Sequence, residues 1–172
     1  MSILLPRRAA EPPYPFPIYA RTGWLIPLPT EHEINQIQAT SRVMSIHAQE
    51  MLKWRRNLVI RSESIYPYNC VGMIFASRRA WIDIDHIYDV LREDGYEQVA
   101  IDQVIEGDVV LYKRGGLPTH IGLIITIDRS LGTPNIRVMS KWGADPEFIH
   151  FIEDVPEIFG RPSEFYTDRR TP

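Results

Sequence analysis

The stretch YPYNCVGMIF, residues 66–75, contains the only cysteine of the chain and leads into a run of small and apolar residues. Pro67 favours an extended conformation in the residue before it and removes one backbone donor, whereas Asn69 is a good helix N-cap. Because residues 71–81 are mostly apolar or small, we expect a buried helix to begin here. Cys70 would then lie in the first turn of a core helix.

Two interpretations of Cys70 follow from that position. A thiol in the first turn is close to unpaired backbone N–H groups, which lower its pKa and favour the nucleophilic thiolate. Free cysteine is also among the most often buried residues, and there it only packs. A catalytic cysteine needs a histidine elsewhere in the chain, so the rest of the sequence must decide.

Length and composition indicate one globular domain. The chain has 172 residues, of which 44% are hydrophobic and 24% charged, and its formal net charge is -3. This mild acidity, without a basic stripe, argues against nucleic acid as a partner. A single cysteine excludes an internal disulfide framework and a multi-cysteine zinc site, and we expect neither a cofactor nor a metal.

The distribution of apolar residues argues against a membrane location. No apolar run approaches the roughly 20 residues that span a bilayer, and the first residues lack the roughly 7 to 15 apolar residues of a signal peptide. We therefore expect a cytoplasmic protein without membrane contact. No pattern indicates the oligomeric state.

Residues 1–29 are rich in proline, which favours an extended path and excludes helix. Several aromatic residues in this segment indicate that it lies on the domain formed by residues 30–172. A linker or a proline-rich recognition peptide is the alternative.

Three helices are predicted. Thr30 and Glu33 form a capping box, and apolar residues at spacings of three and four extend a helix from there to about Asn57. The Cys70 helix is the second. Asp83 can cap a third, which ends near Gly95.

The second half of the chain is predicted to form strands. Residues 109–113, 120–128 and 135–142 are rich in β-branched residues and are separated by Gly and Pro turns, and 148–152 is a candidate fourth strand. Helices followed by a meander predict an α+β domain in which the helices, one carrying Cys70, pack on one face of an antiparallel sheet.

His120 opens the second of these strands, fifty positions after Cys70 and directly after a loop that contains Gly115 and Gly116. A histidine beside a Gly-rich loop that keeps a site open is well placed to act as general base toward a cysteine. Taken alone, a histidine in a strand is more often structural.

Three segments, residues 69–72, 107–112 and 120–124, read NCVG, GDVVLY and HIGLI. They resemble, in order, the Asp-Cys-Ser-Gly, Gly-Asp-Hyd-Hyd and His-Val-Gly-Ile motifs of papain-like enzymes of the bacterial NlpC-type branch, relatives of the CHAP amidases. The resemblance covers about residues 66–142. Asn69 and Val71 depart from the family residues Asp and Ser.

The resemblance implies a papain-like fold and a cysteine peptidase or amidase. The Cys70 thiolate would attack the carbonyl of a peptide or another amide-containing small substrate, and His120 would take and return the proton. A third residue should orient His120 from the following strand, where Ser140 is the best-placed polar residue. His150 is the other candidate, and Asn135 lies only at the start of that strand.

Further residues are candidates for substrate binding. The oxyanion would be met by the Cys70 N–H and by a tyrosine hydroxyl, although both tyrosines also suit plain packing. The segment 140–143, SKWG, and the histidine after it form an unusual local motif in a meander. The candidates are Tyr66, Tyr68, Asn69, Lys141, Trp142 and His150.

Two other functions remain compatible with these residues. The altered flanks of Cys70 and the uncertain third residue suit a non-catalytic papain-fold module that binds a peptide or a partner protein. Acyl transfer could use the same cysteine and histidine, and the sequence does not separate it from hydrolysis.

Overall fold

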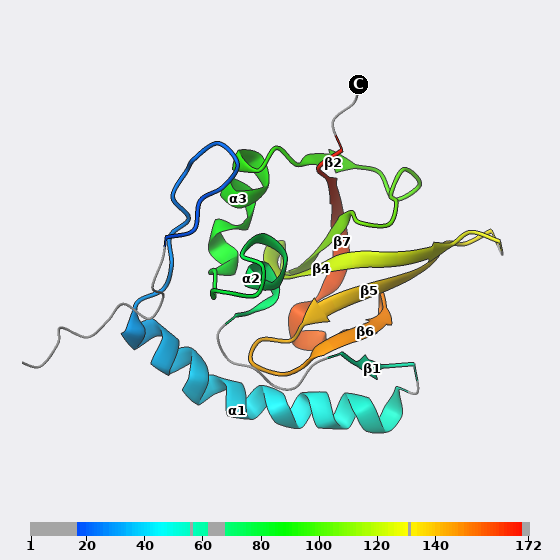
Figure 1. Ribbon diagram of the computed structural model, residues 1–172. Helices are drawn as coiled ribbons and strands as arrows, with labels where there is room; N and C mark the ends of the chain where they lie inside the picture. The colour runs from blue at the N-terminus through cyan, green and yellow to red at the C-terminus, as the bar shows by residue number, and fades with distance from the viewer. Residues whose placement is uncertain (1–16, 56, 62–67, 131, 170–172) are drawn as a thin grey trace, which may run out of the picture.

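The computed structural model describes residues 17–55, 57–61, 68–130 and 132–169. The chain forms helices and an antiparallel sheet in an α+β arrangement (Figure 1). The helical elements are α1 (Glu31–Trp54), α2 (Cys70–Phe75), η1 (Ile84–His86), α3 (Ile87–Glu93) and η2 (Glu157–Phe159). The strands are β1 (Val59–Ile60), β2 (Glu97–Val99), β3 (Val109–Arg114), β4 (Leu117–Asp128), β5 (Asn135–Lys141), β6 (Glu147–Phe151) and β7 (Arg161–Thr167).

The sheet has the strand order β1-β6-β5-β4-β3-β7-β2, and each described pair is antiparallel. The predicted meander is confirmed, because β3, β4, β5 and β6 pair consecutively. The sequence did not predict β1, β2 or β7. The first two are only two and three residues long, and β7 contains Pro162, which is atypical of strand sequences.

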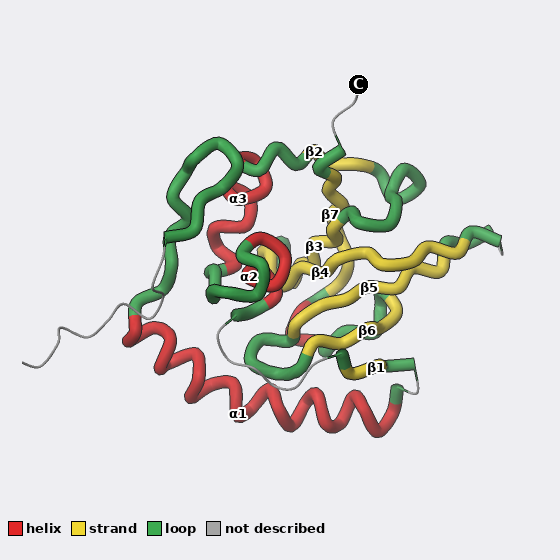
Figure 2. The backbone as a smooth tube through the Cα atoms, viewed as in Figure 1, coloured by secondary structure: helices red, strands yellow, loops and turns green. Residues whose placement is uncertain are grey.

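The two faces of the sheet pack against different helices. Val109, Leu111 and Ile121 join one core cluster with residues of α2 and α3, whereas Val110 and Tyr112 join a second with Ala48 of α1. Successive residues of a strand point to opposite faces, which explains the division. The expectation that the helices share one face is therefore wrong, and α1 lies apart from α2 and α3 (Figure 2).

The start of the described chain packs on the domain. Ile18, Ala20 and Ile26 are buried in the cluster that contains α2, and Tyr19 pairs with Leu25 in an isolated antiparallel bridge. Trp24 is partly buried against the same cluster, whereas Tyr19 is 58% exposed. Residues 1–16 of the proline-rich segment lie outside the described residues.

The first helix begins as the sequence predicts, but the second is shorter than predicted. Thr30 and Glu33 form both hydrogen bonds of the capping box. The Cys70 helix ends at Phe75 because Ser77 and Arg78 adopt positive φ angles of 48° and 64°, and the Arg78 N–H donates to the Gly72 carbonyl. Because α2 ends well before residue 81, the segment that follows turns back toward the first turn of this helix.

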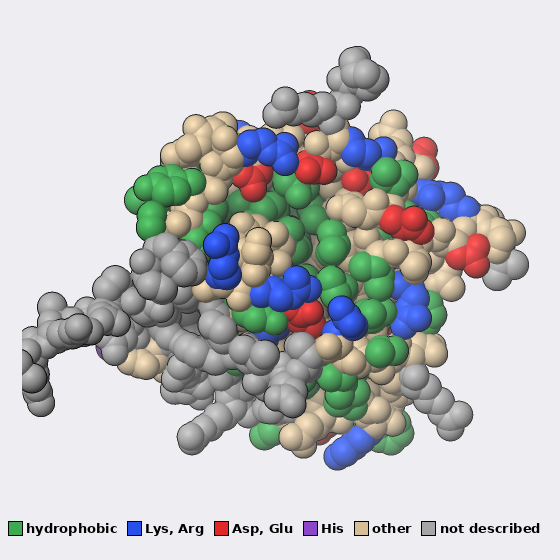
Figure 3. All heavy atoms as spheres, viewed as in Figure 1, with side chains coloured by type: hydrophobic (Ala, Val, Ile, Leu, Met, Phe, Trp, Pro, Cys, Tyr) green, Lys and Arg blue, Asp and Glu red, His purple; other side chains and the backbone are tan. Residues whose placement is uncertain are grey.

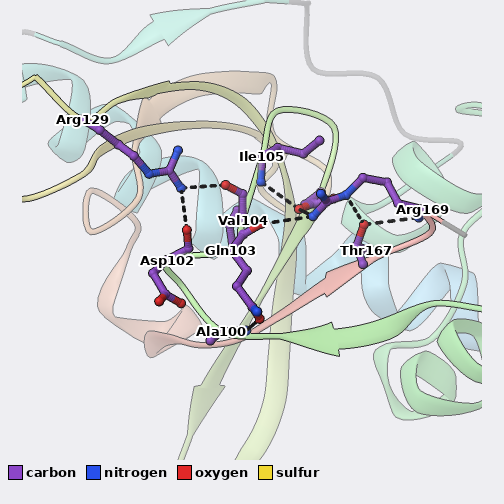
Figure 4. Close-up of polar contacts among 9 residues, drawn as sticks. Ala100, Asp102, Gln103, Val104, Ile105, Arg129, Thr167 and Arg169 are labelled. Carbon is purple, nitrogen blue, oxygen red and sulfur yellow. Dashed lines mark hydrogen bonds and ion pairs between the residues drawn. The ribbon is translucent and has the colours of Figure 1, made fainter. Parts of the chain in front are cut away.

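Asp108 of the Gly-Asp motif has a structural role at the start of β3. Figure 4 shows the contacts of Arg169, one of its partners. Its carboxylate accepts from the Ile105 N–H at 2.8 Å and from the Arg169 guanidinium at 2.9 Å. Arg169 also donates to the Thr167 hydroxyl and the Gln103 carbonyl. These contacts fasten the end of β7 to the loop that leads into β3.

Part of the sheet face beside α2 is only half-buried. Leu123, Met139 and Ile149 lie directly opposite one another on β4, β5 and β6. Hydrophobic side chains gather in the middle of the visible face, with basic side chains beside them (Figure 3). Among the described residues, no helix is long and apolar enough to span a bilayer.

Candidate active site

A pocket of about 230 Å³ lies at the first turn of α2 and is lined by the predicted nucleophile and the predicted base, but not by Ser140. Cys70 enters it from the helix, and His120 enters it from β4. The remaining lining residues are Asn69, Trp81, Asp83, Ile84, Thr119, Gly143 and Phe159. Of the predicted substrate-binding residues that the structure describes, only Asn69 lines this pocket.

Asn69 fixes the start of α2. Its Oδ1 accepts from the N–H groups of Gly72 at 3.0 Å and Ile82 at 3.3 Å, and its Nδ2 donates to the Ile82 carbonyl at 2.6 Å. The side chain therefore caps the helix and also ties it to the segment that follows. An aspartate at this position could not donate to the Ile82 carbonyl, which gives a physical reason for asparagine.

Replacing Asn69 by Asp is expected to lower the free energy of unfolding by about 2 kcal/mol at pH 7, because a buried carboxylate oxygen would face the Ile82 carbonyl. Urea denaturation measures the change. Asp83→Asn is the matched control, since Asp83 caps η1 by accepting from the Asp85 N–H and asparagine keeps that acceptor. Equal stability of Asn69→Asp and the wild type would contradict the assigned double contact.

The Cys70 thiol is 6% exposed, and its pKa is raised to about 11. Burial is the main cause, and it outweighs the backbone N–H groups of Ile121, Val71 and Cys70 itself, which favour the thiolate. The expectation that the helix start lowers the pKa is therefore wrong. A helix of six residues with a dehydrated first turn does not compensate for the loss of water.

His120 is fully buried, although the sequence suggested a loop that keeps the site open. Gly115 and Gly116 only form the turn between β3 and β4, with φ angles of 60° and 84°. Phe159 stacks on the imidazole with ring centroids 4.2 Å apart and planes at 18°. Burial, with a smaller contribution from His150, holds the pKa of His120 well below its usual range, so the ring is neutral.

Neither ring nitrogen of His120 has a hydrogen-bond partner among the described residues. The Cys70 sulfur shares the pocket with the ring but is not hydrogen-bonded to it. A buried polar atom without a partner costs about 1–3 kcal/mol, and most native proteins contain few of them. His120 is therefore a neutral imidazole at the wall of a pocket, and neither of its nitrogens is hydrogen-bonded within the described part of the chain.

Thr119 fixes the position of Phe159, the aromatic residue that stacks on His120. Its hydroxyl contacts the carbonyl of Phe159 at 2.6 Å and that of Tyr112 at 3.2 Å. The contact links β4 to η2, directly beside the stacked His120 and Phe159 rings. This arrangement positions the imidazole by packing instead of by a hydrogen bond.

The two candidates for a third catalytic residue bond to each other. His150 Nδ1 donates to the Phe151 carbonyl at 2.8 Å, so in the neutral ring Nε2 is the acceptor. The Ser140 hydroxyl, 2.8 Å away, therefore donates to Nε2, and it accepts from the Trp142 indole N–H at 3.1 Å. The predicted hydrogen bond from Ser140 to His120 is absent, because the single hydroxyl proton goes to His150.

Burial lowers the pKa of His150 to about 4, and this shift predicts a pH dependence of stability. The neutral ring is favoured in the fold, so its contribution is complete above pH 6.5 and is lost as the pH falls toward 4. As the pH falls toward 4, the free energy of unfolding of His150→Gln should fall by about 3 kcal/mol less than that of the wild type. Urea denaturation between pH 7 and pH 4.5 measures it, and an unchanged slope would contradict the assignment.

Several predicted binding residues lie behind the pocket and do not line it. The Tyr68 hydroxyl donates to Glu147 at 2.9 Å, and Arg78 contacts the same carboxylate at 2.6 Å. Lys141 lies 5.2 Å from the centre of the Tyr68 ring. Trp142, His150, Tyr68 and Lys141 are buried and absent from the pocket lining, whereas Tyr66 lies outside the described residues.

Sequence reasoning missed most of the residues that complete the pocket. Thr119 could have been found as the neighbour of His120, but nothing in the sequence connects Phe159 with a histidine in β4. Within the described part of the chain, no three His, Cys, Asp or Glu side chains are arranged to hold a metal ion.

No protein-family model matches the chain, and no curated protein or solved structure matches it significantly.

Proposed function

We propose that the protein is a cysteine hydrolase that cleaves an amide bond, with Cys70 as nucleophile and His120 as general base. The observation that carries this proposal is the pair of unsatisfied ring nitrogens of His120, fully buried at the pocket that also contains the Cys70 thiol. A structural histidine satisfies its nitrogens, as His150 does. An unsatisfied one suits a group that must exchange protons with a substrate.

The papain-like fold is part of the same proposal. A cysteine in the first turn of a buried helix, a Gly-Asp turn before one strand and a histidine on the next strand occur here in the order of the NlpC-type family. The element order supports the likeness, and α2 packs against β4, the strand that carries His120.

The proposed reaction starts from a neutral thiol and a neutral imidazole. When an amide substrate enters the pocket, the thiol proton moves to His120 while sulfur attacks the carbonyl carbon. The backbone N–H of Cys70, in the first turn of α2, can donate to the oxyanion. His120 then returns the proton to the leaving amine, and water releases the acyl group.

A non-catalytic binding module is the second candidate, favoured by one observation. The pKa of Cys70 is about 11, so almost no thiolate exists at neutral pH in the free protein. Such a pocket would bind a peptide or partner segment without reaction. In that case His120 would receive a hydrogen bond from the bound molecule and would not transfer a proton.

The test is hydrolysis of a panel of amides and short peptides by the wild type and by Cys70→Ala. The enzyme proposal requires turnover by the wild type and its loss in the variant. Turnover that persists in Cys70→Ala would refute the role of Cys70. Saturable binding of a peptide without any turnover would establish the second candidate instead.

A further inference from the structure

Asp83 brings a negative charge to the pocket that contains Cys70 and His120. The other lining residues that the structure describes are uncharged, because burial keeps the thiol and the imidazole neutral and the rest have no ionisable group. Among the described residues, Asp83 forms no ion pair with a basic side chain. The described lining of the pocket therefore carries one negative charge without a positive partner.

The structural role of Asp83 does not explain this charge. Its Oδ1 caps η1 by accepting from the Asp85 N–H at 3.0 Å, and no described residue donates to Oδ2. Asparagine is about as good an N-cap as aspartate, because the cap needs only one side-chain oxygen. The second carboxylate oxygen of Asp83 is therefore available to a bound molecule.

The pocket walls next to this carboxylate are apolar. Trp81 and Ile84 flank Asp83 closely in the chain, are half-buried and line the same pocket, whereas Asp83 itself is exposed. An apolar wall that ends at an exposed carboxylate is complementary to a side chain with an aliphatic stem and a cationic end. Among the natural amino acids, lysine and arginine have this form.

We infer that Asp83 makes this pocket select ligands with a cationic side chain, so that the substrates are peptides with a lysine or arginine beside the cleaved amide bond. This inference rests on the proposed function and names its substrate class. The aliphatic stem lies against Trp81 and Ile84, and the ammonium or guanidinium group pairs with the Asp83 carboxylate at the exposed edge of the pocket. Asp83 takes no part in proton transfer and determines specificity.

Two thiol reagents of similar size and opposite charge test the inference without any turnover. They are the trimethylammonium-ethyl and the sulfonato-ethyl methanethiosulfonates, and each rate with Cys70 is divided by the rate of the same reagent with mercaptoethanol. We expect the cationic reagent to react about tenfold faster with the wild type, since a carboxylate about 8 Å away attracts one reagent and repels the other. The ratio of the two rates does not depend on the thiolate fraction of Cys70.

Asp83→Asn should reduce this ratio at least about fivefold, because asparagine keeps the cap and removes the charge. Asp83→Glu should keep most of it. Asp85→Asn is the matched control, since Asp85 is an exposed carboxylate two residues away that does not line the pocket, and it should keep the wild-type ratio. An equal fall in Asp83→Asn and Asp85→Asn would overturn the inference. A wild type that reacts no faster with the cationic reagent would overturn it without any variant.

Hydrolysis separates this inference from the proposed function. For two peptides that differ only by lysine or norleucine beside the cleaved bond, we expect kcat/KM to be about tenfold higher with lysine, and Asp83→Asn should remove the difference. Equal kcat/KM values for the two peptides with the wild type would overturn the substrate class and leave the hydrolase proposal intact. Absence of hydrolysis of both, with charge-selective modification of Cys70, would refute the hydrolase and leave Asp83 as the selector of cationic ligands.

Discussion

His120→Phe is expected to abolish amide hydrolysis, with a loss of about a thousandfold or more in kcat/KM, while the protein becomes about 1 kcal/mol more stable. Phenylalanine keeps the stacking on Phe159 and the packing on Tyr112, and it removes two buried nitrogens that have no partner. Opposite signs for activity and stability are typical of a residue retained for function. Urea denaturation and the amide assay measure the two effects.

His150→Phe is the matched control. Both nitrogens of His150 are hydrogen-bonded, and phenylalanine would leave the Ser140 hydroxyl and the Phe151 carbonyl without this partner. We expect a loss of about 2 kcal/mol in the free energy of unfolding. If His120→Phe destabilises the protein as much as His150→Phe does, the His120 nitrogens must be hydrogen-bonded. The main support for the catalytic proposal would then be lost.

Gly72→Ala is expected to destabilise the protein by about 3 kcal/mol or more. A Cβ at this position would lie 1.7 Å from the Ala80 carbonyl oxygen and 3.2 Å from the Tyr68 Cβ. Because the obstacle at Ala80 is backbone, the chain after α2 must move away from the helix. The turn that brings Ile82 to Asn69 would open, and the Cys70 pocket would open with it.

The unfolding midpoint in urea measures this effect, and the alkylation rate of Cys70 reports the opening of the pocket. Gly132→Ala is the control: nothing lies within 4 Å of its added Cβ, so only the backbone strain at a φ of 85° remains, about 1 kcal/mol. Gly122→Ala should fall between the two, because its nearest neighbour at 2.3 Å is a side-chain methyl group of the buried Val138 and not backbone. A Gly72→Ala protein as stable as the wild type would contradict the close packing of α2.

Elements governed by nearby residues were predictable from the sequence. The capping box of Thr30 and Glu33 needs only one helical turn, and the β3–β6 meander needs only short turns between β-branched segments. The cap at Asn69 was predicted for the same reason. The second contact of Asn69, with Ile82, depends on a turn at Ser77 and Arg78. This turn contains no glycine, so the sequence does not predict it.

Features that depend on distant residues were not predictable. The pKa of Cys70 is determined by how completely the surrounding chain excludes water, which the helix position does not reveal. The burial of His120 depends on Phe159, from a different part of the chain. Ser140 bonds to His150 and not to His120, a preference that depends on the register between β5 and β6, where Val138 lies opposite His150.

The place of β7 in the sheet has a consequence for how the chain folds during synthesis. β7 separates β2 from β3, so β2 pairs with a strand that is synthesised only after the whole meander. The pairing of Glu97 with Thr167 closes a long loop, and contacts of that kind form slowly. The nascent chain therefore carries the meander with an unpaired β3 edge until β7 emerges. That edge is the surface at which a truncated or stalled chain would aggregate.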